Sequence, residues 1–127
     1  MVRLLVTGGR DYGWWVEGKS EADRLAEVTH IESTLALIHE KRGITVLIHG
    51  DAQGADTVAD CWCRFREIAV LPFLANWKKF GNAAGPIRNK QMLDEGKPDG
   101  IVAFPGGNGT ADMVARGEAA GLVVWRR

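Results

Sequence analysis

The feature that most constrains this chain is an alternation between short apolar runs, typical of strands, and longer segments with helical periodicity. The apolar runs occupy residues 3–7, 44–49, 69–74, 100–104 and 122–125. A helical segment separates each run from the next, which is the pattern of βαβ units with right-handed crossovers. We therefore predict an α/β fold, a single Rossmann-like three-layer domain with an open, mainly parallel five-stranded sheet.

The first helical segment has the clearest boundaries. Ser20 and Asp23 form a capping-box pattern at its start, apolar residues recur at helical spacing from Leu25 to Ile38, and Gly43 ends it. Further helices are expected at about residues 55–67, 86–95 and 110–121. The longest predicted loops, which in a compact domain commonly carry function, are residues 8–19 and 75–85.

The length and the charge bound the class of protein. The 127 residues suffice for one domain, residues 1–127, with its own core. Sixteen basic side chains balance sixteen acidic ones, so no global charge draws the chain to bulk nucleic acid or to an anionic membrane. The first 60 residues carry six basic and ten acidic side chains, and the remainder carries ten basic and six acidic. An anionic ligand is therefore expected to meet the second half.

The cellular setting follows from what the sequence does not contain. The longest apolar run, residues 68–75, includes Pro72 and is far shorter than the roughly 20 residues that span a bilayer. The first residues do not have the pattern of a signal peptide. Cys61 and Cys63 are two residues apart, which cannot by itself make a zinc site. We expect a cytoplasmic protein without a membrane segment, a metal or a cofactor.

Three glycine-bearing loops follow the first, second and fourth predicted strands. Parallel strands bring these loops to one edge of the sheet, where such folds bind ligands. Glycine lets backbone N–H groups approach an oxyanion closely, and a helix that begins there adds positive potential. We predict a small ligand that carries phosphate, held by Thr7, Gly8, Gly9, Arg10, Asp11, Gly50, Asp51, Gly54, Ala55, Asp56, Pro105, Gly106, Gly107, Asn108, Gly109 and Thr110.

A nucleotide triphosphatase is a less favoured hypothesis. Residues 13–20 match the P-loop pattern, with Gly13 first and Lys19 and Ser20 last. A true P-loop begins where its strand ends, whereas here the strand ends near Thr7 and five residues intervene. Two tryptophans also stand where the loop should wrap closely around phosphates.

Four ordered motifs together indicate a family. They are Val-Thr-Gly-Gly-Arg-Asp-Tyr at 6–12, His-Gly-Asp-Ala-Gln-Gly-Ala-Asp at 49–56, Gly-Pro-Ile-Arg-Asn at 85–89 and Phe-Pro-Gly-Gly-Asn-Gly-Thr-Ala-Asp at 104–112. They closely resemble the YspA-like family, an often phage-associated branch of the SLOG superfamily, which is related to DprA-type Rossmann-like domains. The resemblance implies a protein that binds a nucleotide or a nucleotide-derived ligand, such as a sensor of ADP-ribose-like or NAD-derived molecules.

The resemblance also implies an alternative, because the superfamily includes the Lonely guy (LOG) phosphoribohydrolases. Their Pro-Gly-Gly-x-Gly-Thr-x-Glu-Glu motif is similar to residues 105–113, with Asp112 and Met113 at the two glutamate positions. In such an enzyme of nucleoside monophosphates, Arg88 would pair with the phosphate or orient the ribose. Asp112 would stabilise the oxocarbenium-like state through which the glycosidic bond breaks. Arg88 and Asp112 are therefore the candidate catalytic residues.

Each polar candidate also has a structural interpretation. Asp112 could complement the dipole of its helix, and Arg88 could be a solvated surface charge. Asp51 and Asp56 could cap the second helix, and His49 could bond to the backbone instead of a ligand.

Three tryptophans fall in the two long loops, and two interpretations of them stay open. Trp14, Trp15 and Trp77 could stack on a nucleobase, or they could cover an oligomer interface. The resemblance to LOG proteins implies a homodimer.

Overall fold

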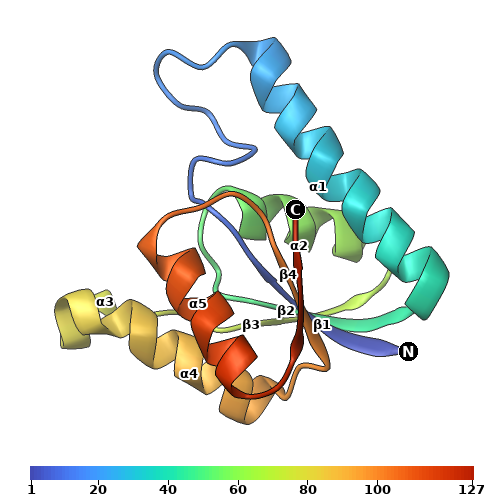
Figure 1. The fold of residues 1–127 in the computed structure, drawn as a ribbon. Helices are drawn as coiled ribbons and strands as arrows, with labels where there is room; N and C mark the ends of the chain where they lie inside the picture. The colour runs from blue at the N-terminus through green and yellow to red at the C-terminus, as the bar shows by residue number, and fades with distance from the viewer.

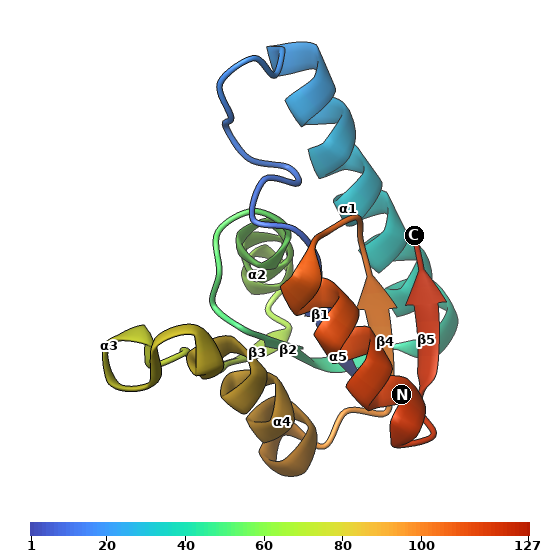
Figure 2. The ribbon, with the colours of Figure 1, turned by 60° about the vertical axis from the view of Figure 1, so that its left-hand side comes forward.

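A computed structural model describes residues 1–127 as one open sheet with helices on both faces (Figure 1). The sheet has the order β3-β2-β1-β4-β5, and every neighbouring pair is parallel. The predicted fold class is therefore confirmed. The strands are β1 (Val2–Thr7), β2 (Ile44–His49), β3 (Ala69–Pro72), β4 (Gly100–Ala103) and β5 (Val123–Arg126). Figure 2 shows β4 and β5 side by side at one edge.

The helices form two layers. The helices α1 (Glu21–Arg42) and α2 (Ala55–Phe65) cover one face of the sheet, and α4 (Ala84–Gly96) and α5 (Asn108–Ala119) cover the other (Figure 1). Alternate residues of a strand point to opposite faces. Leu4 and Val6 of β1 accordingly join the larger apolar cluster, whereas Leu5 joins the smaller one. The central strand β1 thus contributes side chains to the apolar cluster on each face of the sheet.

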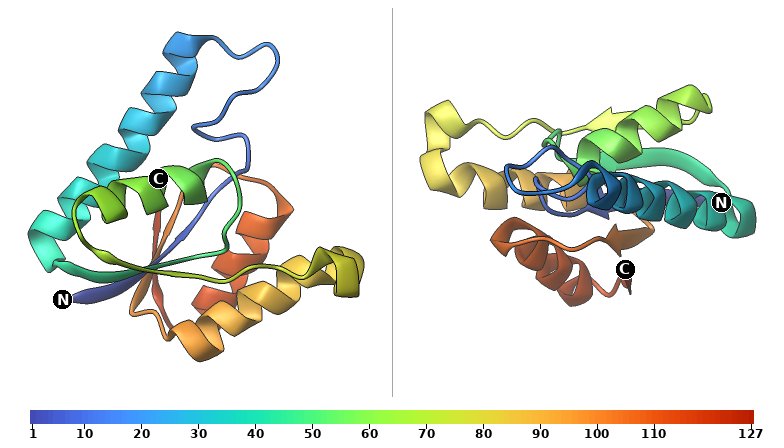
Figure 3. Two further views of the ribbon diagram at one scale, coloured as in Figure 1. Left: turned by 180° about the vertical axis from the view of Figure 1, so that it is seen from behind. Right: turned by 90° about the horizontal axis from the view of Figure 1, so that it is seen from above.

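The predicted boundaries of α1 are confirmed, but not its whole apolar face. The Ser20 hydroxyl accepts the Asp23 N–H at 3.0 Å, and Gly43 ends the helix with φ 70°. Leu25 is 48% exposed, although its spacing predicts burial. The first turns of α1 extend past the sheet beside the loop that precedes them (Figures 1 and 3).

The predicted loop at residues 75–85 is largely helical. It contains the short helix α3 (Trp77–Phe80) and a 3-10 turn, η1 (Gly81–Ala83), and α4 then begins two residues before Pro86. The Asn76 side chain starts α3 by accepting the Lys79 N–H at 3.0 Å. One helical turn leaves no periodicity to detect, so the sequence pattern could not indicate it. Figure 3 shows α3 at the end of the molecule remote from the N-terminus.

No helix combines the length and the hydropathy needed to cross a bilayer. No three His, Cys, Asp or Glu side chains gather where a metal ion could bind. Cys61 is exposed and Cys63 is buried, and neither forms a disulfide.

Candidate functional site

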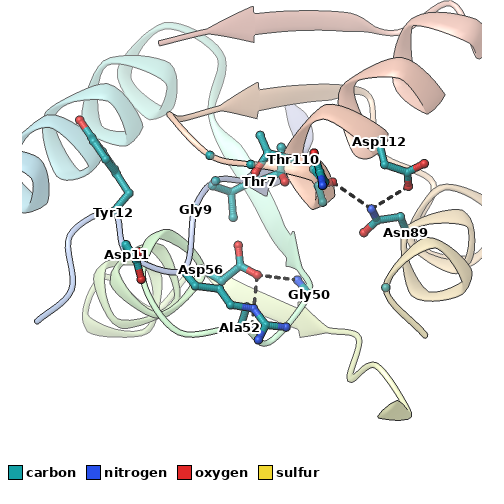
Figure 4. Close-up of a pocket in the computed structure, with 18 of the residues that line it drawn as sticks. Thr7, Gly9, Asp11, Tyr12, Gly50, Ala52, Asp56, Asn89, Thr110 and Asp112 are labelled. Carbon is teal, nitrogen blue, oxygen red and sulfur yellow. Dashed lines mark hydrogen bonds between the residues drawn. The ribbon is translucent and has the colours of Figure 1, made fainter. Parts of the chain in front are cut away.

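A pocket of about 810 Å³ opens at the carboxyl edge of the sheet. It lies where β1 and β4 run side by side, which is the point at which the strand order reverses and where folds of this kind bind ligands. Loops from β1, β2 and β4 meet there with the first turns of α4 (Figure 4). Fifteen of the eighteen predicted site residues line the pocket: Thr7, Gly8, Gly9, Arg10, Asp11, Gly50, Asp56, Arg88, Pro105, Gly106, Gly107, Asn108, Gly109, Thr110 and Asp112.

The loops after β1 and β4 are in direct contact through glycines. The Gly9 N–H donates to the Pro105 carbonyl oxygen at 2.8 Å. A Cβ built on Gly9 would lie 3.0 Å from that oxygen, and one built on Gly106 would lie 2.7 Å from the Gly9 nitrogen. Only glycine fits at these two positions without moving a loop.

The loop after β4 presents a row of free backbone donors. The N–H groups of residues 106–110 have no acceptor in the protein, and the first bond of α5 runs from Ala111 N–H to Gly107 O at 3.0 Å. No side chain caps this helix. These amides belong to residues that line the pocket, and unpaired N–H groups at the positive end of a helix dipole are suited to binding a phosphate oxygen.

The fold itself does not require glycine at positions 107 and 109. Neither has a positive φ, and a Cβ on either would have no heavy atom within 4 Å. The fold would accept a side chain at both places. Both glycines line the pocket.

The loop after β2 is organised differently from the predicted anion cradle. Its amides at Gly50 and Ala52 donate to the Asp56 carboxylate at 3.1 and 3.3 Å (Figure 4). Asp56 is 6% exposed, and this burial raises its pKa above the ordinary value. The protein's own carboxylate thus occupies the donors that the glycine pattern offered to a ligand.

Two further predicted residues support the loop after β1 and do not line the pocket. Gly54 has φ 81°, and a Cβ there would collide with the carbonyl oxygens of Gly9 and Arg10. The Ala55 N–H donates to the Gly9 carbonyl at 3.3 Å. Both residues fix the position of the first loop.

Asp51 lies outside the pocket, next to a buried histidine. Its N–H donates to His49 Nδ1 at 2.9 Å, so the ring proton sits on Nε2 and is donated to Asp60 at 2.6 Å. His49 is 1% exposed. The structural interpretation of His49, a bond to the backbone, is confirmed.

Arg88 is held as a donor at the pocket wall. Its Nη1 donates to the Gly50 carbonyl and its Nε to Asn89 Oδ1 at 3.1 Å, while Nη2 has no acceptor in the protein. Burial lowers the pKa of Arg88, the nearby Asp56 carboxylate opposes this shift, and the Arg10 charge adds to it. Neither arginine pairs with a carboxylate. The pocket therefore contains two guanidinium groups without a direct ion-pair partner, together with the carboxylates of Asp11, Asp56 and Asp112.

Asp112 is anchored between α4 and α5. Its Oδ2 accepts Asn89 Nδ2 at 3.0 Å and Arg116 Nε at 2.8 Å, whereas Oδ1 accepts no bond. Burial would raise the pKa of Asp112, but these two bonds outweigh it and lower the pKa. Asn89 also donates to the Gly109 carbonyl at 3.2 Å. Asn89 lines the pocket and was not among the predicted site residues, although it adjoins Arg88 in one of the four motifs.

The P-loop pattern does not form a P-loop. The Lys19 ammonium bonds to the Asp11 carbonyl and, at 2.7 Å, to Glu27, which also accepts the Gly13 N–H at 2.8 Å. Thirteen residues separate the end of β1 from the start of α1. The lysine fastens the loop to α1, so this geometry does not support the triphosphatase hypothesis.

The loop tryptophans have separate surroundings. Trp77 lines the pocket, whereas Trp14 and Trp15 do not. Trp15 is 65% exposed, with the Arg24 guanidinium 3.8 Å above its ring centroid.

Comparisons with known proteins identify the family. Residues 2–80 match the model of the "YspA, cpYpsA-related SLOG family". The chain is also 35% identical over 131 positions to the Gene 61 protein of Mycobacterium phage D29, covering 98% of this chain and 94% of that protein. No solved structure gives a significant match. The chain belongs to the YspA-type SLOG family, as the four motifs indicated.

Proposed function

We propose that this protein binds a nucleotide or a nucleotide-derived molecule in the pocket between β1 and β4, with a phosphate on the amides of residues 106–110. The observation that carries the proposal is that row of five unpaired N–H groups at an uncapped helix N-terminus. Two arginines without an ion-pair partner, Arg10 and Arg88, line the same pocket. Membership of the SLOG family favours the same class of ligand.

The two arginines extend the proposal to ligands with more than one phosphate. Arg88 is pre-positioned by the Gly50 carbonyl and Asn89, so little side-chain freedom is lost when it binds. Arg10 is exposed, forms no hydrogen bond or ion pair, and adds a second positive charge to the same pocket. ADP-ribose and NAD-derived molecules are therefore included among the proposed ligands.

Calorimetric titration with AMP, ADP-ribose and adenosine tests the proposal. AMP and ADP-ribose should bind, while adenosine, which lacks phosphate, should bind at least tenfold more weakly. Arg88→Gln should lower the affinity for AMP by about tenfold to a hundredfold, since a charge-assisted hydrogen bond contributes about 1.5–3 kcal/mol. Arg64→Gln is the matched control, because Arg64 is 61% exposed on α2 and does not line the pocket. Equal affinity for adenosine and AMP would refute the phosphate site.

A LOG-like phosphoribohydrolase is the second candidate, favoured by the free Oδ1 of Asp112. That oxygen belongs to an ionised carboxylate that lines the pocket. Met113 is fully buried in the core at the motif's second acidic position, so only one of the two acids is present. Release of free base from AMP that disappears in Asp112→Asn would establish this activity. Binding of AMP without base release would restrict the protein to binding.

A further inference from the structure

We propose that Trp77 is the platform on which the base of the ligand stacks, and that the guanidinium of Arg10 closes over the other side of the base. This inference rests on the proposed function, because it assigns the second half of the same pocket. Trp77 lies on α3, an element that no sequence motif marked.

Trp77 offers the pocket's free aromatic surface. The other aromatic residue in the lining, Tyr12, is stacked on Phe104 with 6.2 Å between ring centroids, and its hydroxyl bonds to His30 at 2.6 Å. Trp77 has no aromatic partner and remains 44% exposed. A planar ligand group entering the pocket can therefore stack on Trp77 and not on Tyr12.

The ring is seated by a glycine. A Cβ on Gly85 would lie 3.2 Å from the tip of the Trp77 ring, so a side chain there would press the ring away from α4. Gly85 has no positive φ, and its place in the first turn of α4 does not otherwise demand glycine. The missing side chain at Gly85 therefore lets the tip of the indole lie close to the start of α4.

The Arg10 guanidinium already lies over the Trp77 ring, farther away than in a close cation–π contact. Its guanidinium carbon is 5.2 Å from the Trp77 centroid, compared with 3.8 Å for Arg24 over Trp15. Two stacking layers need roughly 7 Å, since carbon atoms in contact are about 3.5 Å apart. An outward movement of about 2 Å by an exposed, unpaired arginine makes room for one base.

The subsite also lies within reach of the phosphate site. Arg10 follows Gly9, whose N–H is bonded to Pro105 at the start of the phosphate loop. A nucleotide with its phosphate on residues 106–110 can thus lay its base toward α3. Base and phosphate then meet different parts of the pocket, and separate variants can address them.

Titrations with AMP and with ribose 5-phosphate, which has the sugar and the phosphate without a base, test the assignment. Trp77→Ala should lower the affinity for AMP at least fivefold, because stacking of a base on an aromatic side chain typically raises affinity 5- to 150-fold. The affinity for ribose 5-phosphate should be unchanged. Trp77→Phe should keep most of the affinity. Trp15→Phe, on the exposed loop outside the pocket, is the control and should bind AMP as the wild type does.

The outcomes separate this inference from the proposed function. Unchanged AMP binding by Trp77→Ala, with wild-type affinity intact, would overturn the stacking platform alone. An equal loss of AMP and ribose 5-phosphate would also overturn it, because the ring would then only support the phosphate site. Failure of the wild-type protein to bind any nucleotide in the panel would refute the proposed function itself.

Discussion

Replacing Gly109 with alanine is expected to stabilise the free protein and to lower its affinity for the ligand. Gly109 lies in the first turn of α5, outside the left-handed region, and no heavy atom lies within 4 Å of the position of a Cβ. Alanine therefore fits without displacing anything. It also has less conformational freedom to lose on folding than glycine.

The two magnitudes have opposite signs. A compatible glycine-to-alanine change typically adds about 0.4–1 kcal/mol to the free energy of unfolding. With an unfolding entropy of about 2.1 cal/mol/K per residue, this chain should gain about 2–4 °C in Tm. A phosphate held by the Gly109 N–H would meet the new methyl group, and we expect an AMP affinity at least tenfold lower, which is about 1.4 kcal/mol.

Thermal unfolding without ligand and calorimetric titration with AMP measure the two effects. Ala115→Gly, on the exposed side of the same helix, is the control: it should lower the stability by up to about 1 kcal/mol and leave the affinity unchanged. A Gly109→Ala protein that binds AMP like the wild type would refute the close approach of ligand to this backbone. A lower Tm would refute the claim that the fold does not need glycine here.

Three further predictions concern the rest of the site and the core. Gly54→Ala should destabilise the protein by about 3 kcal/mol or more in urea unfolding, because a Cβ at positive φ collides with backbone of the first loop; a loss under 1 kcal/mol would contradict this. Burial raises the pKa of Asp56, so the native state holds that proton more tightly than the unfolded chain. The contribution of Asp56 to the free energy of unfolding should be lost as the pH rises above 3.8 through the raised pKa, and Asp56→Asn should not show that decline. Parallel pH profiles of stability for the wild type and Asp56→Asn would contradict the raised pKa. Burial raises the pKa of the Cys63 thiol to about 12, so a thiol reagent should label Cys61 alone in the native protein, with mass spectrometry as the readout.

The fold could be predicted because its signals are local. Apolar runs separated by helical segments indicate a parallel sheet, and the Ser20 cap and Gly43 mark the ends of α1 to the residue. The edge at which the glycine loops meet follows from the parallel strands alone. Leu25 shows the limit of periodicity, since the pattern gives a face of the helix but not whether the sheet reaches that far.

The site could be predicted only in part, because hydrogen-bond partners depend on tertiary structure. The glycines at 50 and 54 look like those at 106 and 109 in the sequence. In the structure the Asp56 carboxylate accepts amides of the loop after β2, whereas the amides of the loop after β4 have no acceptor. Asn89 acts by reaching across from α4 to Asp112 on α5, a contact between residues 23 positions apart. No spacing rule within one element reports such a pair.

The backbone N–H groups of residues 106–110 are proposed to hold the phosphate of a nucleotide, and amide NMR observes these groups directly. Titrating the ¹⁵N-labelled protein with AMP should move the amide protons of residues 106–110 downfield, as expected for hydrogen bonds to an anion, and adenosine should not. AMP binding that leaves these five resonances in place would contradict the claim.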